Sequence, residues 1–390
     1  MIIDPADRLN QVQEYYFSRK LQEIRNLNNR GFDIINLGIG SPDLMPSRET
    51  INALVDSARN PKNHGYQPYR GIAELRDAIS RWCSITYRID LNPDAEILPL
   101  MGSKEGITHI SLAFLNPGDK VLVPELGYPS YKAVTEMVGG IAETYPLIED
   151  KNWIPDLDYL NNQDLSEYKI MWINYPHMPS GSPADLSVFE SLVILAKEKG
   201  ILLCHDNPYS LILNEDPPTS LLYAEGAFEV ALELNSFSKS HNMAGWRIGW
   251  LSGKKEYIDT VLKIKSNFDS GMFRGIQDAA IAALDNTRDW HNKRNQTYRG
   301  RREMVYRLLN KLDCTWTDGQ VGMFVWARIP DYIPDVEKWV DEILYEYKVF
   351  ITPGFIFGDK GKRYVRMSLC SDNELFQEAL NRLKDYNYKT

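Results

Sequence analysis

The sequence predicts an α/β protein with a large, doubly wound and mainly parallel sheet and a second, smaller α+β domain. Two observations carry this prediction. Short, continuous apolar runs recur along the chain, as is typical of parallel strands covered on both faces. Amphipathic helical segments lie between these runs, and such alternation is typical of a doubly wound domain. The expected strands are residues 97–101, 120–124, 169–175, 201–206, 230–235 and 247–253.

Helices are expected between and after these strands. Two sets of apolar residues recur at spacings of three and four, the pattern of a buried helix face. They are Ile72, Leu75, Ile79 and Trp82, and Leu186, Phe189, Leu192 and Ala196. After about residue 285 the pattern changes, which predicts a large domain over 46–285 and a small domain made of 1–45 and 286–390. In the small domain we expect helices at about 296–312, 336–347 and 373–386 and strands at 323–329 and 364–369.

Composition and charge exclude several classes of protein. A chain of 390 residues with 43% hydrophobic residues can bury a sizeable core. A net charge of −9 disfavours nucleic acid and anionic membranes as partners. The four scattered cysteines predict reduced thiols in a cytoplasmic protein, without a zinc site or other metal centre. No secretory signal and no apolar stretch of membrane-spanning length is visible.

Lys239 is the candidate catalytic residue. It follows an apolar run, lies among hydroxyl-bearing residues and precedes an arginine by eight positions. A lysine held near fixed cations can lose its proton and attack carbonyl carbon. Ser236, Ser238 and Arg247 are suited to hold a phosphate. A phosphate-bearing carbonyl compound bound by a lysine is pyridoxal 5′-phosphate (PLP). The alternative is a solvated lysine in a polar loop.

Asp206 is expected at the edge of the sheet where ligands bind, because it ends a buried apolar strand. PLP chemistry needs an acid beside the pyridine nitrogen, although a strand-end aspartate can also simply cap the next turn. Tyr209, three residues later, is placed to reach the phenolic oxygen of the cofactor. His205 is expected to be a packed histidine, not a catalytic base.

Two glycine-containing turns complete the predicted site. Residues 101–106 join a strand to a helix, and the free N–H groups of the helix start, with Ser103, would bind an anion. The alternative there is an ordinary tight turn. The other turn, around Gly40, is not a dinucleotide fingerprint, since Asp43 replaces the third glycine and Pro42 would break the helix start. It fits a close approach of backbone to a ligand.

In this order and spacing, the chain resembles the class I and II PLP-dependent aminotransferases, the aspartate aminotransferase fold family of fold type I, over nearly its whole length. The resemblance implies a Schiff base between PLP and Lys239, with Asp206 at the ring nitrogen and Tyr209 at the phenolic oxygen. The further cofactor contacts that it implies are Gly102, Ser103, Lys104, Tyr128, Ser236 and Arg247.

The same resemblance implies substrates and an assembly. Arg366, in Tyr-Val-Arg-Met-Ser-Leu, matches the arginine that grips the α-carboxylate of the substrate, and Gly40 lines the substrate side. The substrates would be an amino acid and a 2-oxo acid. Tyr66 matches the tyrosine that reaches the phosphate of the partner subunit, so a homodimer is expected.

One position departs from the family pattern. Where the family has Asn-Pro-Thr-Gly, this chain has Met178-Pro-Ser-Gly. A methionine cannot donate a hydrogen bond to the phenolic oxygen. His177 or Asn174 could supply a substitute donor.

Three alternatives to an aminotransferase stay open. A PLP-dependent C–S β-lyase shares the fold and cofactor, but such enzymes often lack a match to Arg247. A regulator carrying such a module needs an added DNA-binding domain, for which the segment before Gly38 is too short. A catalytically dead member would be expected to lose Lys239 or Asp206.

Substrate choice is only weakly marked in the sequence. Phe268 stands near the position where aspartate aminotransferases place a partner-subunit arginine for the side-chain carboxylate, which disfavours a strict aspartate enzyme. The segment around it resembles LL-diaminopimelate aminotransferase-like relatives. Tyr15, Tyr16 and Phe17 could form a lid at the entrance or, as is commoner, the apolar face of an N-terminal helix.

Overall fold

The computed structural model describes residues 3–6, 8 and 16–387, and a seven-stranded sheet forms its centre. Its strands are β2 (Ile97–Leu100), β3 (Lys120–Pro124), β4 (Ile141–Tyr145), β7 (Tyr168–Ile173), β8 (Leu202–Asn207), β9 (Ala231–Ser236) and β10 (Gly249–Gly253). The spatial order is β2-β10-β9-β8-β7-β3-β4. The strands from β9 to β4 pair in parallel, whereas β10 is antiparallel to both of its neighbours.

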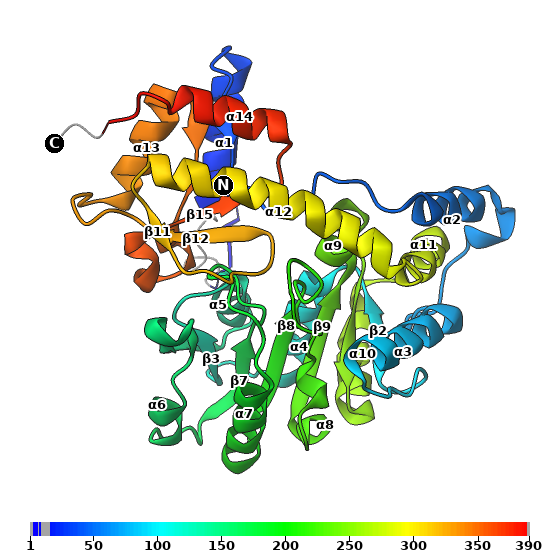
Figure 1. The fold of residues 1–390 in the computed structure, drawn as a ribbon. Helices are drawn as coiled ribbons and strands as arrows, with labels where there is room; N and C mark the ends of the chain where they lie inside the picture. The colour runs from blue at the N-terminus through cyan, green and yellow to red at the C-terminus, as the bar shows by residue number, and fades with distance from the viewer. Residues whose placement is uncertain (1–2, 7, 9–15, 388–390) are drawn as a thin grey trace.

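Helices cover both faces of this sheet (Figure 1). Alternate residues of each strand point to opposite faces, so Leu202 and Cys204 pack in one apolar cluster and Leu203 in another. The first cluster includes α4 (Ser103–Phe114) and α10 (Lys255–Phe268), and α5 (Ser130–Met137) packs beside it; the second includes α3 (Ala73–Tyr87) and α7 (Leu186–Lys199). This alternation decides which strand-end side chains face the site.

A second, antiparallel sheet is built from the C-terminal part of the chain. Its order is β11-β12-β15-β14 for β11 (Thr315–Trp316), β12 (Phe324–Arg328), β15 (Tyr364–Ser368) and β14 (Thr352–Pro353). The N-terminal segment joins this part of the molecule, because β1 (Ile35–Asn36) pairs in parallel with β13 (Val349–Phe350). Helices α1 (Tyr16–Asn29), α13 (Val336–Tyr347) and α14 (Asn373–Arg382) complete the region.

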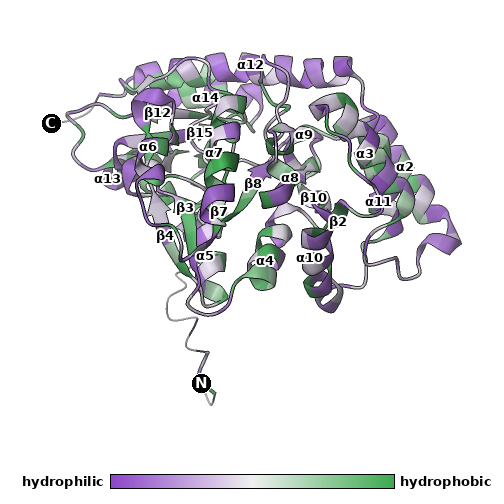
Figure 2. Cartoon of the chain, turned by 90° about the horizontal axis from the view of Figure 1, so that it is seen from below, coloured by the Kyte–Doolittle hydropathy of each residue, from purple (hydrophilic) through white to green (hydrophobic). Residues whose placement is uncertain are grey.

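Helix α12 (Arg288–Lys311) crosses from one part of the molecule to the other (Figure 1). Toward its N-terminal end, the Arg294 guanidinium donates to the Ser240 and Leu211 carbonyl oxygens. Further along, Arg301 donates to both carboxylate oxygens of Asp43 at 2.7 Å. The helix surface is mostly hydrophilic, whereas the central strands are mostly hydrophobic (Figure 2).

The remaining elements are short or peripheral. The helices are α2 (Arg48–Arg59), α6 (Leu157–Asn161), α8 (Ala227–Val230), α9 (Phe237–Ser240) and α11 (Arg274–Leu284), and β5 (Leu147–Ile148) pairs with β6 (Ile154–Pro155). The 3-10 helices are Pro61–Asn63, Glu149–Lys151, Leu221–Tyr223, Ala244–Trp246, Gly354–Phe357 and Asp359–Arg363. Within the described residues, no helix has both the length and the apolar character needed to cross a bilayer.

The predicted fold class is confirmed, and so is the type of every predicted element. The helix expected at 336–347 has those ends, because Asp335 caps its first N–H groups and Lys348 ends it in the left-handed conformation. The division into domains at residues 46 and 285 stays a prediction.

Three details of the prediction are wrong. The strand expected at 247–253 begins at Gly249 and is antiparallel, because Arg247 has a left-handed φ of 54° that no strand accepts. Helix α12 begins at Arg288, not near 296, because Thr287 caps it and its first two turns are held by polar contacts without an apolar stripe. The edge strand β4 was not predicted, since its outer residues are exposed and its sequence lacks a continuous apolar run.

Candidate active site

A cleft of about 430 Å³ opens at the carboxyl ends of β7, β8 and β9 and reaches Arg366 on β15. The cleft therefore lies between the two sheets, where side chains from distant parts of the sequence meet. Most of the site residues predicted from the sequence line it, namely Gly40, Ser103, Lys104, Tyr128, Asp206, Tyr209, Ser236, Lys239, Arg247 and Arg366. Gly102 lies directly behind the lining, and Tyr66 lies outside it with 93% of its surface exposed.

Lys239 reaches the cleft from α9, which directly follows β9. Its ammonium donates to the carbonyl oxygen of Gly40, so the turn around Gly40 lies beside the lysine in the cleft. Burial lowers the pKa of Lys239, and the positive charges of Arg366 and Arg247 lower it further. Both effects make the ammonium easier to deprotonate, as a nucleophilic amine requires.

Asp206 is buried at the end of β8, with 6% of its surface exposed. Tyr131 donates from its hydroxyl to one carboxylate oxygen, Oδ2, at 2.9 Å. The other oxygen, Oδ1, is buried and has no hydrogen-bond partner among the described residues. Burial raises the pKa of Asp206 to about 6, although the hydrogen bond from Tyr131 and the charge of His205 oppose this rise. A buried carboxylate oxygen without a partner is suited to a cationic group of a ligand.

The anion-binding end of the cleft is formed by two helix starts and Arg247. Ser236 caps α9 by accepting from the Ser238 N–H at 3.1 Å, and Arg247 donates to the Ser238 hydroxyl at 3.3 Å. Gly102, at the start of α4, has a φ of 90°, and a Cβ there would lie 2.3 Å from Arg247 Nη2. Glycine at this position lets the guanidinium lie against the turn.

Arg366 marks the opposite end. It donates to the Gly38 carbonyl oxygen at 2.9 Å, and its Nη1 lies 3.2 Å from the Met178 sulfur. The guanidinium also lies 3.8 Å from the centre of the Phe324 ring. A thioether is a weak acceptor, so a substrate carboxylate would be a much stronger partner for this arginine.

Met178 occupies the cleft where the family pattern has asparagine, and both possible substitute donors make hydrogen-bond contacts with other groups. His177 contacts the Ser180 hydroxyl at 2.6 Å with Nδ1 and the Leu126 carbonyl at 3.0 Å with Nε2. The Asn174 amide donates to the Asp206 carbonyl oxygen at 2.6 Å. Both side chains are therefore already engaged elsewhere.

Tyr131 and Phe324 were missed by the sequence reasoning. Tyr131 lies in the first turn of α5 and Tyr128 just before that helix, and the centres of their rings are 5.7 Å apart. Of the predicted lid residues, Phe17 is buried against the cleft and Tyr16 packs against Phe355, whereas Tyr15 lies outside the described residues.

Phe268 lies at the end of α10, 63% exposed and outside the cleft of its own chain. Its ring packs on His109, which forms a group with Glu105 and Asp269 whose possible metal-ligand atoms lie within 4.8 Å of one another. The Lys265 ammonium is 2.8 Å from Asp269. A positive charge is thus already present in this group.

The residues of the cleft fit PLP. The unpartnered Asp206 Oδ1 suits a protonated ring nitrogen, Lys239 suits the carbonyl carbon, and the helix starts with Arg247 suit the phosphate. Tyr128 lines the cleft between these groups, where an aromatic side chain can pack on a flat ring.

Comparison with known proteins agrees with this chemistry. The family model described as aminotransferase class I and II matches residues 33–383. The LL-diaminopimelate aminotransferase of Moorella thermoacetica is 38% identical over 380 residues, 97% of each chain, and that of Aquifex aeolicus is 37% identical over 97% of this chain and 98% of its own. Among solved structures, substrate-bound BacF from Bacillus subtilis matches with a TM-score of 0.93, 34% identity and 98% coverage of each chain.

Proposed function

We propose that this chain, which belongs to the class I and II aminotransferase family, moves an amino group between an L-amino acid and a 2-oxo acid with PLP held on Lys239. The observation that carries this proposal is the meeting of Lys239, the unpartnered oxygen of Asp206 and Arg366 in one cleft. The C–S β-lyase alternative is not favoured, since the full-length relatives are named as aminotransferases.

PLP, when bound, supplies a carbonyl carbon for the substrate amine and a ring that accepts electrons. The chain's own residues supply the rest. Arg366 grips the substrate α-carboxylate with two parallel hydrogen bonds and so orients the α-carbon. The Lys239 amine, whose pKa is lowered by burial, takes the proton from that carbon. Asp206 holds a proton on the ring nitrogen through its free oxygen, and Tyr209 donates to the phenolic oxygen.

Covalent labelling tests the role of Lys239. Borohydride reduction of the loaded protein should attach the cofactor to Lys239, and Lys239→Ala should abolish both labelling and transamination. Lys104→Ala is the matched control, because it removes a second lysine of the same cleft and should leave the label in place. Transamination at the wild-type rate by Lys239→Ala, or a label on another lysine, would refute the assignment.

We also propose that the enzyme is a homodimer that works in the cytoplasm. The high exposure of Tyr66 and Phe268 supports a partner surface, and four free cysteines suit a reducing compartment. Tyr66 would then reach the phosphate of the partner's site. Sedimentation of the loaded protein at twice the 44.9-kDa chain mass would support the dimer, and a monomer would refute it.

For the substrate, we propose an amino acid with an apolar side chain. The cleft is lined by Phe17, Leu21, Ile39 and Phe324, and the rings of Phe17 and Phe324 lie beside the Arg366 guanidinium. Asp206 is the only carboxylate among the lining residues that the structure describes. In the proposed site this carboxylate contacts the cofactor ring, so it does not contact the substrate side chain. The distal ammonium of LL-diaminopimelate, the compound in the relatives' names, would meet no carboxylate of the described residues there.

A panel of amino donors decides between these substrates. Each is mixed with the loaded enzyme, and the absorbance change of the first half-reaction gives the specificity constant. Leucine, methionine and phenylalanine should exceed LL-diaminopimelate and aspartate. The reverse order would show that residues of a partner subunit or outside the described part of the chain complete a polar subsite.

A further inference from the structure

The turn at residues 38–43, which we call the glycine turn, follows β1 and contacts two cationic side chains of the cleft. Its Gly38 carbonyl oxygen accepts a hydrogen bond from Arg366 Nη2 at 2.9 Å. Two residues later, the Gly40 carbonyl oxygen accepts from the Lys239 ammonium. Because one short segment holds both side chains, its position affects where both of them lie.

The glycine turn is held in place by side chains and not by secondary structure. Regular pairing ends just before it, where the Leu37 N–H donates to the Phe350 carbonyl oxygen at 2.9 Å. Within the described part of the chain, residues 38–46 make no backbone-to-backbone hydrogen bond. Segments with few such bonds open at low free energy, so the position of the turn depends on the side chains that contact it.

Arg301 on α12 makes a two-pronged ion pair with Asp43 at the end of the glycine turn. Its Nη1 and Nη2 donate to the two carboxylate oxygens of Asp43, both at 2.7 Å, and only 4% of the arginine side chain is exposed. Nη1 also donates to the Leu369 carbonyl oxygen at 3.1 Å. Leu369 directly follows β15, the strand that carries Arg366. Arg301 therefore links the end of the turn to the strand from which Arg366 projects.

The other side-chain contacts of this segment involve neutral groups. The Thr352 hydroxyl donates to the Gly38 carbonyl oxygen at 3.1 Å, and the Asn242 amide donates to the Met45 carbonyl oxygen at 3.1 Å. Hydrogen bonds between charged groups are roughly twice as strong as neutral ones. The pair of Asp43 and Arg301 is therefore the strongest of these contacts.

We propose that Asp43 and Arg301 are positioning residues, whose ion pair fixes the glycine turn so that the Gly38 carbonyl holds Arg366 in place for the substrate carboxylate. The inference rests on the proposed function and adds two residues that do not line the cleft. Two parallel hydrogen bonds to a carboxylate require an exact orientation of the guanidinium, so a displaced turn weakens substrate binding. The groups proposed to hold the cofactor phosphate lie on other elements, so cofactor affinity should hardly change.

The test is the double variant Asp43→Ala/Arg301→Met, which removes the pair without leaving a buried charge. The KM values for the best amino donor of the panel above and for its own 2-oxo acid should both rise roughly 10- to 100-fold. The dissociation constant of PLP should hardly change. In the apoprotein, amide hydrogen exchange should become faster at residues 37–43 but not in β8 and β9, and this measurement needs neither cofactor nor turnover.

The ion pair of Asp33 and Arg382 provides the matched control, because it also joins the N-terminal segment to a C-terminal helix. Arg382 Nη2 lies 2.6 Å from Asp33 Oδ2, and neither residue lines the cleft. Arg382→Met should leave both KM values and the exchange at residues 37–43 unchanged. If the double variant does not fold, Asp43→Asn, which keeps one acceptor oxygen for Arg301, should show the same changes to a smaller extent.

The outcomes separate this inference from the proposed function. Lower folding stability with unchanged KM values would reduce the pair of Asp43 and Arg301 to a structural contact and overturn the inference. Equal increases in KM in Arg382→Met, or unchanged exchange at residues 37–43 in the double variant, would also overturn it. A wild-type protein that transaminates no donor of the panel would refute the proposed function, and the exchange experiment would still decide whether the pair fixes the turn.

Discussion

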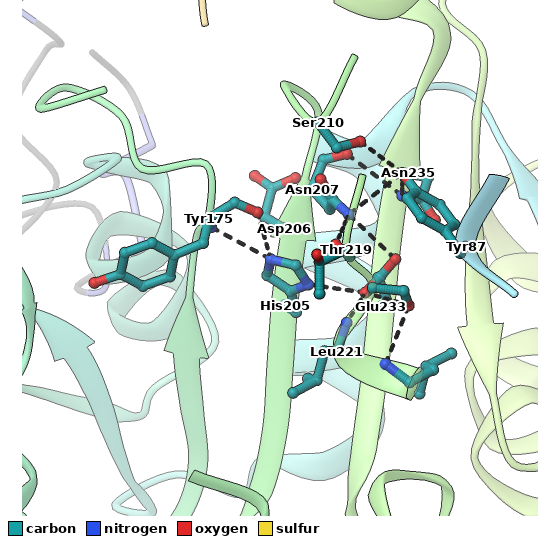
Figure 3. Close-up of polar contacts among 12 residues, drawn as sticks. Tyr87, Tyr175, His205, Asp206, Asn207, Ser210, Thr219, Leu221, Glu233 and Asn235 are labelled. Carbon is teal, nitrogen blue, oxygen red and sulfur yellow. Dashed lines mark hydrogen bonds and ion pairs between the residues drawn. The ribbon is translucent and has the colours of Figure 1, made fainter. Parts of the chain in front are cut away.

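Asp206 and Glu233 are two buried carboxylates on neighbouring strands, and they are partnered in opposite ways. Glu233 contacts a hydroxyl, a backbone N–H and a histidine ring nitrogen, all within hydrogen-bond distance (Figure 3). Asp206 accepts one, from Tyr131, and its second oxygen has no partner among the described residues. Protein interiors rarely leave such an oxygen unsatisfied, so the contrast separates a group that holds the fold together from a group prepared for a ligand.

The same contrast in hydrogen bonding separates the layer behind the cleft, where Glu233 and His205 lie, from the edge of the sheet. In the layer behind the cleft, both carboxylate oxygens of Glu233 are matched by protein partners. At the edge of the sheet, the second carboxylate oxygen of Asp206 has no protein partner among the described residues. Substitutions behind the cleft should therefore change folding stability, and substitutions at the edge should change ligand affinity or even stabilise the protein.

The largest effect on stability is expected at Glu233. Glu233→Ala removes the buried acceptor of His205 Nδ1, the Ser220 hydroxyl and the Leu221 N–H. Each buried donor left without a partner costs about 1–3 kcal/mol in the free energy of unfolding. Urea unfolding of the apoprotein measures this loss. Glu233→Gln, which can still accept from Ser220 and Leu221, should lose less. A loss under about 1 kcal/mol for the alanine variant would break the comparison.

Arg366→Ala should act on ligands instead. Loss of a charge-assisted pair with the substrate carboxylate costs about 2–5 kcal/mol, or roughly 30- to 5,000-fold in kcat/KM. Amino acids and 2-oxo acids should weaken together, because both carry this carboxylate, and cofactor content should hardly change. Loss of cofactor with unchanged substrate affinity would mean that Arg366 has been placed at the wrong end of the cleft.

Asp206→Asn should stabilise the apoprotein at pH 8 while weakening cofactor binding. The folded-state pKa of Asp206 is about 6, above its usual 3.8, so the folded protein binds the extra proton between these values. Wild-type stability therefore falls as pH rises through 6, by about 3 kcal/mol in all. In thermal or urea unfolding, the Asn variant should have a higher free energy of unfolding than wild type at pH 8 and an equal one near pH 4. An Asn variant less stable at every pH would contradict this.

The smallest effect is expected at Met178. An asparagine there would donate a hydrogen bond to the phenolic oxygen of the cofactor and make the nitrogen joined to Lys239 easier to deprotonate. The pH midpoint of the absorbance change of the loaded protein should thus be lower in Met178→Asn, by about one to two units at most. Equal midpoints would reveal a substitute donor, and a higher midpoint in the variant would refute the electrostatic argument.

The sequence predicted the edge of the sheet better than the layer behind it. Lys239 and Asp206 follow apolar strands, and a polar residue at that point is a strong signal because strand ends meet at one edge. Glu233 lies within Ala-Leu-Glu-Leu, a run whose composition predicts a strand buried on both faces. A carboxylate inside such a strand must be paired, but its partner, His205, lies 28 residues away in the chain, and single-sequence patterns do not record strand pairing.

The start of α12 and the role of Tyr131 could not be predicted from the sequence for a related reason. The first turns of α12 are held by Arg294 and its contacts with two distant carbonyl groups, not by apolar periodicity. The role of Tyr131 follows from its hydrogen bond to Asp206, which is 75 residues away in the chain. Patterns within a segment predict that segment, whereas contacts between segments need the fold.

Gly102 bears on how this protein can change over evolutionary time. Any replacement adds a Cβ 2.3 Å from Arg247 Nη2 on a backbone with φ of 90°, so every single amino-acid change there strains the backbone and makes the guanidinium shift. Leu21 and Ile39, which also line the cleft, have no positive φ of this kind. Descendants of this sequence can therefore diverge in the amino acids that they accept long before they can diverge in the cofactor that they use.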